Sequence, residues 1–189
     1  TALSVCTPAS TEGVVNGYGK DDFNTRTESG CLGQAGAVTV ESHSYWFRIK
    51  MAKGGEFGFD IISADQSEDW DFAVYGPNKT CMALPDPIKC NVSGSPGKTG
   101  VGDTNPNDPD YPYDSWMEVF AGDEYLILVN NFSGTNAGFK IEWKGSIFEG
   151  GSDVLDCNIE LDLGPDRLIC DNTSAIAPNR RLWANTFSN

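Results

Sequence analysis

The chain has 189 residues, of which 39% are hydrophobic and 11% aromatic, and its 13 lysines and arginines stand against 27 aspartates and glutamates. The formal charge of −14 argues against a nucleic-acid or anionic-lipid partner, because both are held by clustered basic side chains. The apolar content is too high for an acidic disordered tail, and a single histidine, His43, argues against histidine-centred catalysis.

The cysteines indicate where the protein folds. There are six, an even number, without any C-x-x-C pair: Cys6, Cys31, Cys81, Cys90, Cys157 and Cys170. This pattern favours disulfides over a zinc site. Their connectivity is not fixed by sequence, but proximity favours Cys6–Cys31, Cys81–Cys90 and Cys157–Cys170. We therefore expect an oxidising compartment, which could be a periplasm, and take an extracellular or cell-surface location as the prediction.

The first 37 residues are polar and rich in turns, and strand patterns begin at residue 38. Apolar residues then alternate with polar ones over 45–51, 57–61 and 70–74, as in strands with one buried face. The alternation places Phe47, Phe59 and Phe72 inward, and it places Trp46 and Asp71 on the opposite faces of their strands.

Residues 76–114 differ, because they hold seven prolines and few periodic apolar positions, which predicts long loops. Strand patterns return over 116–120, 124–130 and 139–143, and residues 124–130 are apolar on both faces, as in a central strand. No window has helical periodicity. The prediction is an all-β fold, a jelly-roll-like antiparallel β-sandwich with long loops, and a barrel is the alternative.

The character of the chain changes at residue 149. Residues 149–156 are expected to be a flexible linker after a sandwich over 1–148, and residues 157–189 to begin a second β module or an assembly segment. The short C-terminal β segment is too small for a complete sandwich, so we expect the chain to be a fragment of a longer protein.

Four segments between Ser44 and Gly145 carry a resemblance to a known family. They are Ser44-Tyr-Trp-Phe-Arg-Ile49, Gly55-Glu-Phe-Gly-Phe-Asp-Ile61, Asp69-Trp-Asp-Phe-Ala-Val-Tyr-Gly76 and Ala121-Gly-Asp-Glu-Tyr-Leu-Ile-Leu-Val-Asn-Asn-Phe-Ser133. This block resembles the pre-peptidase C-terminal-like jelly-roll domain. The resemblance implies an accessory module without catalytic activity of its own.

A second resemblance lies near the C-terminus, in Leu161-Asp-Leu-Gly-Pro-Asp-Arg-Leu-Ile-Cys-Asp171. It is similar to the opening of immunoglobulin- or PKD-like modules, which recur in surface proteins that gliding bacteria export by type IX secretion. Together the two resemblances imply a modular surface protein with an adhesive or assembly role.

One acidic loop has the composition of a calcium site. From Asp103 to Asp114 the sequence spaces carboxylates and amides as calcium loops do, and Ca²⁺ prefers such hard oxygen ligands. We expect Asp103, Asn105, Asn107 and Asp108 as ligands, with a solvated proline-stiffened loop as the alternative. In a second acidic cluster, Asp65, Glu68, Asp69 and Asp71, the strand residue Asp71 is expected to face solvent or to cap a neighbouring loop, with a metal site as the alternative.

Aromatic residues follow the acidic loop. Tyr111 and Tyr113 are flanked by prolines and are expected to be exposed and ligand-binding, whereas Trp116 is expected to pack in the core. No G-x-S-x-G motif, phosphate-binding glycine loop or 18-residue apolar run occurs, so neither an enzyme nor a membrane-inserted chain is predicted.

The function predicted is that of an extracellular, non-catalytic module for adhesion or assembly, whose partners are other protein modules, protomers or surface glycans. The alternatives are a carbohydrate-binding module, a filament subunit completed by strand exchange, and an accessory domain of a secreted peptidase.

Overall fold

The computed structural model describes residues 2–17, 23, 29–33, 43–79, 84–102, 111–149, 151 and 153–157. The strands are β1 (Leu3–Val5), β2 (Thr11–Val14), β3 (Ser44–Lys50), β4 (Gly55–Ser63), β5 (Trp70–Tyr75), β6 (Lys89–Asn91), β7 (Lys98–Val101), β8 (Tyr113–Asp114), β9 (Met117–Val119), β10 (Glu124–Asn131) and β11 (Gly138–Lys144). Two short 3₁₀ turns, η1 (Gly30–Gly33) and η2 (Ser146–Phe148), accompany them. Within these ranges, no helix has the length and apolar character to span a bilayer.

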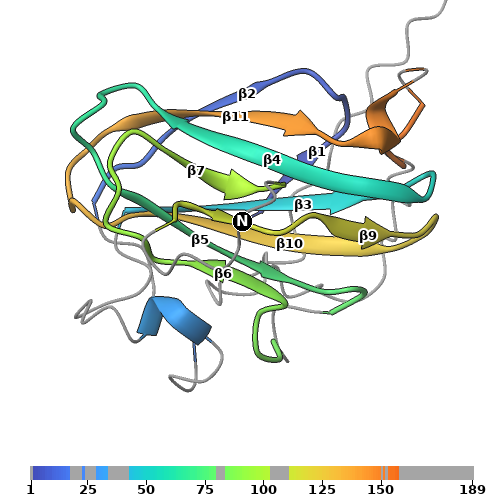
Figure 1. Cartoon of the computed structure of the whole chain (residues 1–189), viewed down its shortest axis with the longest axis horizontal. Coiled ribbons are helices and arrows are strands. Elements are labelled where there is room, and N and C mark those ends of the chain that lie inside the picture. Colours follow the sequence, from blue (N-terminus) through green and yellow to red (C-terminus); the bar gives the residue numbers. More distant parts are fainter. Residues whose placement is uncertain are drawn as a thin grey trace, which may run out of the picture.

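The strands form two sheets packed face to face (Figure 1). The first sheet has the order β1-β3-β10-β5-β6, and the second has the order β2-β11-β4-β7-β8, with β9 paired to the other end of β4. Neighbours are antiparallel except for β1 with β3 and β7 with β8. The predicted all-β sandwich is confirmed, and because the two sheets are separate, the alternative of a closed barrel is wrong.

The core lies between the sheets and follows the predicted alternation. Phe47, Phe59 and Phe72 are all fully buried in one apolar cluster that draws side chains from both sheets. Every residue of β10 except Glu124 is buried, which confirms its prediction as a central strand. Aromatic rings interlock across the interface, for example Phe59 with Phe72 at 5.3 Å between centroids.

A second apolar cluster covers the outer face of the first sheet. It consists of Leu32, Trp46, Ala73, Tyr75, Leu84, Leu126 and Leu128. The turn η1, which supplies Leu32, lies outside the layer formed by β5 and β6 (Figure 1). This sheet is therefore buried on both faces, so the polar-outside expectation fails for its central strands.

The disulfides differ from the predicted neighbour pairs. Cys6 bonds Cys157, 151 residues away, and Cys31 bonds Cys90, 59 residues away. The prediction that cysteines close in sequence pair with each other is wrong. The fold instead places the segment after β1 next to residue 157, and it packs η1 against β6. Cys81 and Cys170 lie outside the described residues.

Part of the expected linker contacts the sandwich. Val154 and Leu155 are buried in the core cluster, and the Ala52 amide donates to the Val154 carbonyl at 2.8 Å. Leu155 forms an isolated antiparallel bridge with Met51. Residues 154–156 of the expected linker thus contact the sandwich. The predicted second module lies outside the described residues except for Cys157.

Candidate functional site

The outer face of the second sheet brings polar and aromatic side chains into one row. The strand registers place Glu142 opposite Asp60, Asp60 opposite Gly100 and Gly100 opposite Tyr113, across β11, β4, β7 and β8. Their neighbours at alternate positions, such as Phe59, point into the core, so the row faces outward. Glycine at position 100 leaves the middle of the row without a side chain.

Asp60 organises the charges of this face. Its carboxylate forms ion pairs with two lysines. Oδ1 lies 2.5 Å from the Lys144 Nζ, and Oδ2 lies 2.8 Å from the Lys98 Nζ. The Asp60 side chain is only 12% exposed, whereas the Lys98 side chain is 49% exposed. The carboxylate is thus screened from water and holds two cations near the surface.

The same lysine contacts the aromatic rings. The Lys144 ammonium lies 4.7 Å from the centroid of the Tyr113 ring and 5.6 Å from that of Trp116, both within cation–π range. The rings of Tyr111 and Tyr113 are 5.8 Å apart and tilted by 48°. All three aromatic residues are half-buried. They form, with Asp60 and the two lysines, what we call the aromatic–lysine face.

Two glycines allow Trp116 to lie on the sheet. A Cβ atom on Gly58 would approach the Trp116 ring to 3.0 Å, and one on Gly102 would approach it to 2.8 Å. Gly102 also has φ +110°, a conformation that other residues rarely adopt. The prediction of Trp116 as a core residue is wrong, because the residue precedes β9 and packs over these glycines on the outside.

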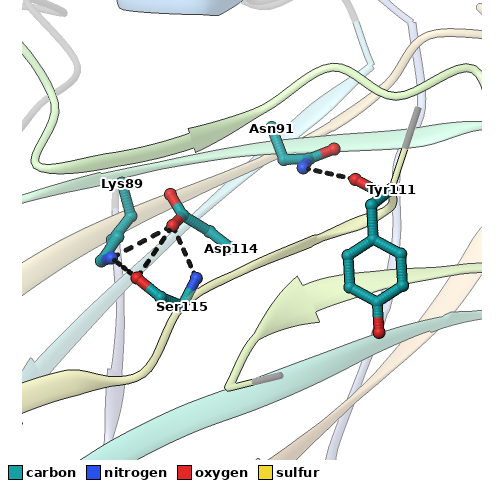
Figure 2. A network of polar contacts seen from close by, with 5 residues as sticks. All are labelled: Lys89, Asn91, Tyr111, Asp114 and Ser115. Carbon is teal, nitrogen blue, oxygen red and sulfur yellow. Dashed lines mark hydrogen bonds and ion pairs between the residues drawn. The ribbon is translucent and has the colours of Figure 1, made fainter. Parts of the chain in front are cut away.

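Hydrogen bonds from β6 of the first sheet hold the segment that carries the tyrosines (Figure 2). Lys89 on β6 donates to Asp114 at 3.1 Å and to the Ser115 hydroxyl at 2.6 Å, and the Asn91 amide donates to the Tyr111 carbonyl at 3.0 Å. In Figure 2 the Tyr111 ring points away from this network. The network fixes the backbone of residues 111–115, and the Tyr111 ring takes no part in it.

The predicted ligand-binding tyrosines are therefore brought together, but sequence reasoning missed their partners. Trp116, Lys98, Lys144 and Asp60 were not singled out as site residues. A usable signal existed in β11, where Lys140, Glu142 and Lys144 alternate with buried residues, because such a row marks one charged strand face.

The predicted calcium ligands Asp103, Asn105, Asn107 and Asp108 lie outside the described residues, and the site stays a prediction. No group of three or more His, Cys, Asp and Glu side chains with metal-binding geometry occurs among the residues that the structure does describe.

The residues of the second acidic cluster have different surroundings and partners. Asp65 accepts hydrogen bonds from the Ser67 amide at 2.9 Å and hydroxyl at 2.8 Å, and these bonds lower its pKa. Glu68 accepts a hydrogen bond from Asn131 at 3.1 Å. Asp71, expected to face solvent, is only 2% exposed, so that expectation is wrong. Burial, together with the charge of Asp69, raises the pKa of Asp71 to about 8.

Comparisons with known proteins give structural similarity only. No family model matches the sequence, and no curated protein matches it. The pre-peptidase C-terminal domain of a collagenase from Bacillus anthracis aligns with a TM-score of 0.42 at 8% identity, over 76% of this chain and 95% of that one. CorA, a surface-associated copper-binding protein of Methylomicrobium album BG8, aligns with a TM-score of 0.38 at 11% identity, over 77% and 98%. At these values the similarities do not assign the chain to a family.

Proposed function

We propose that the chain is an extracellular, non-catalytic adhesion module that binds surface glycans through the aromatic–lysine face. The observation that carries this proposal is the placement of Tyr111, Tyr113 and Trp116 beside Lys144 and Asp60 on the outer face of the second sheet. Sugar rings present C–H faces that pack on aromatic rings, and hydroxyl groups that bond to charged side chains. The face offers both kinds of contact next to each other.

The two disulfides support the extracellular part of the proposal. Bonds such as Cys6–Cys157 and Cys31–Cys90 persist in oxidising surroundings and are rare in the reducing cytosol. The C-terminal resemblance to surface-protein modules supports a place within a larger secreted protein.

A glycan array and pull-down with insoluble polysaccharides test the proposal. We expect the wild-type chain to retain specific glycans and Tyr113→Ala to lose at least tenfold in affinity, whereas Tyr113→Phe keeps the ring and most of the binding. The matched control is Phe120→Ala, which removes an aromatic ring that is 64% exposed but does not belong to this face. No binding to any glycan, or equal binding by Tyr113→Ala, would contradict the proposal.

A second candidate function, assembly with another protein module, is favoured by an adjacent groove that shares Trp116 with the aromatic–lysine face. A groove of about 310 Å³ lies between β6 and β9, and Ile88 and Phe120 in its wall are 44% and 64% exposed. Exposed apolar residues beside edge strands are typical of strand-pairing interfaces. Sedimentation over a range of concentrations tests it. Self-association of the wild type that Phe120→Glu abolishes would support assembly, and a monomer throughout would argue against it.

A further inference from the structure

Asp71 is a carboxylate placed where an apolar residue would be expected. In β5 the side chains of Trp70, Phe72 and Val74 enter the core, so Asp71 lies on the opposite face with Ala73 and Tyr75. Those two neighbours belong to the apolar cluster outside the first sheet. At 2% exposure, Asp71 is as buried as they are and has almost no contact with water.

Two further oxygen-bearing side chains share this position. Asn130 on β10 is directly opposite Asp71 in the register and is 4% exposed. It lies on the same face, because Ile127 and Val129 point into the core and Leu128 into the outer cluster. Asp69, two residues before Asp71, lies on that face too, since strand side chains alternate.

Backbone contacts fix Asp69 in place. Its amide donates to the Ser133 hydroxyl at 2.9 Å, and its carbonyl accepts from the Phe132 amide at 2.9 Å. One carboxylate oxygen, Oδ1, is nevertheless buried without a hydrogen-bond partner. The backbone is held while a carboxylate oxygen beside Asp71 remains unsatisfied.

No positive side chain among the described residues neutralises this pair. The lysines and arginine that form ion pairs there all bind other carboxylates: Arg48 with Glu124, Lys50 with Asp156, Lys89 with Asp114, Lys98 and Lys144 with Asp60, and Lys140 with Glu142. Asp71 takes part in none of these ion pairs. An ionised carboxylate in such surroundings is costly unless a cation or a proton accompanies it.

We propose that Asp71, Asp69 and Asn130 hold a hard divalent cation, with Ca²⁺ as the occupant. The donors are all oxygens, two of them from carboxylates, which is the ligand type that Ca²⁺ selects. Softer metals prefer thiolate or imidazole ligands, and the described cysteines are all in disulfides. The cation links β5 to β10 on the outer side of the first sheet, so its first effect is on stability.

Calorimetric titration of the chelator-stripped full chain with CaCl₂ tests the site, together with the unfolding temperature with and without Ca²⁺. We expect the wild type to bind Ca²⁺ and to unfold at a higher temperature when it is bound. Asp71→Asn and Asp69→Asn should each weaken binding at least tenfold and remove the Ca²⁺-dependent shift. Asp69 is only half-buried, so Asp69→Asn serves where Asp71→Asn fails to fold.

Two controls separate this site from other carboxylates. Asp65→Asn changes an exposed carboxylate in the loop before β5 and should leave Ca²⁺ binding unchanged. The double variant Asp103→Asn/Asp108→Asn changes the acidic loop of the sequence-predicted site and should also leave this binding event in place. No Ca²⁺ uptake at millimolar concentrations would overturn the proposal. In the Asp103→Asn/Asp108→Asn background, where the loop cannot contribute, uptake that survives Asp69→Asn or Asp71→Asn would overturn it too, and so would the loss of all uptake in the loop variant. MgCl₂ in place of CaCl₂ should bind more weakly, and equal or tighter Mg²⁺ binding would overturn the choice of Ca²⁺.

Discussion

Cys6 and Cys157 are joined by a disulfide although 151 residues separate them in the sequence. The bond ties the segment after β1, which pairs with β3, to the segment that follows residues 154 and 155 in the core. Strand β1 and residues 155–156 are thereby both held next to β3 in the first sheet. Together with the bridge between Met51 and Leu155, the bond makes residues 153–157 part of the domain.

Removing this bond should destabilise the whole domain. A cross-link that closes a loop of this length restricts the unfolded chain by about 5 kcal/mol in the chain-entropy model. We expect Cys6→Ser/Cys157→Ser to lower the free energy of unfolding by about 3–5 kcal/mol, measured by urea denaturation under non-reducing conditions. Cys31→Ser/Cys90→Ser removes a bond that closes a shorter loop, so it should lower the free energy of unfolding by less. A larger loss from the second pair would contradict the entropic explanation.

Replacing Asp60 should uncouple the charges of the aromatic–lysine face. The Asp60→Asn variant loses two charge-assisted bonds at a largely buried position, and such bonds contribute about 1.5–3 kcal/mol each. Because the lysines keep their access to water, we expect a net loss of about 1–3 kcal/mol in the free energy of unfolding. Glycan affinity should fall as well, because Lys144 is released from its position beside Tyr113. An Asp60→Asn variant with unchanged glycan affinity would show that Asp60 does not position the face.

Gly102→Ala should displace Trp116 without altering any charge. The new methyl group would approach the indole ring to 2.8 Å, and the backbone would keep an unfavourable positive φ. Strained positions of this kind cost about 1–3 kcal/mol. We expect that loss in thermal unfolding, accompanied by a shift in Trp fluorescence. Gly134→Ala is the control: it has a positive φ of +68° but open space around the Cβ, so it should show backbone strain without the fluorescence change.

The success of sequence reasoning varied with the kind of interaction involved. Alternation placed Phe47, Phe59 and Phe72 correctly, because burial between two sheets imposes a period of two on each strand. The same rule placed Trp46 and Asp71 correctly on the outer face, but it did not predict that this face is buried, because the side chains that cover it come from segments distant in sequence.

The cysteine pairs were predicted incorrectly, and most residues of the aromatic–lysine face were not predicted, for a related reason. Cys31 reaches Cys90 through packing of η1 against β6, and no local spacing encodes that contact. Tyr113 could be singled out from its flanking prolines, whereas Lys144 joins it only through the strand order β11-β4-β7-β8. Long-range topology, rather than residue type, determines these neighbours.

The buried Asp71 carboxyl should make stability depend on pH when Ca²⁺ is absent. Burial, and secondarily the Asp69 charge, raises its pKa from the usual 3.8 to about 8, so the folded state binds a proton that the unfolded state releases above pH 4. The contribution to stability is complete below pH 4 and is lost as the pH rises toward 8. We therefore expect calcium-free protein to lose stability between pH 5 and 8, where other carboxylates titrate little.

Urea denaturation at several pH values measures the slope of the unfolding free energy against pH, which Asp71→Asn should flatten and Asp65→Asn should not. Saturating Ca²⁺ should reduce the slope as well, because the cation replaces the proton. A slope that persists unchanged in Asp71→Asn would place its origin in another group.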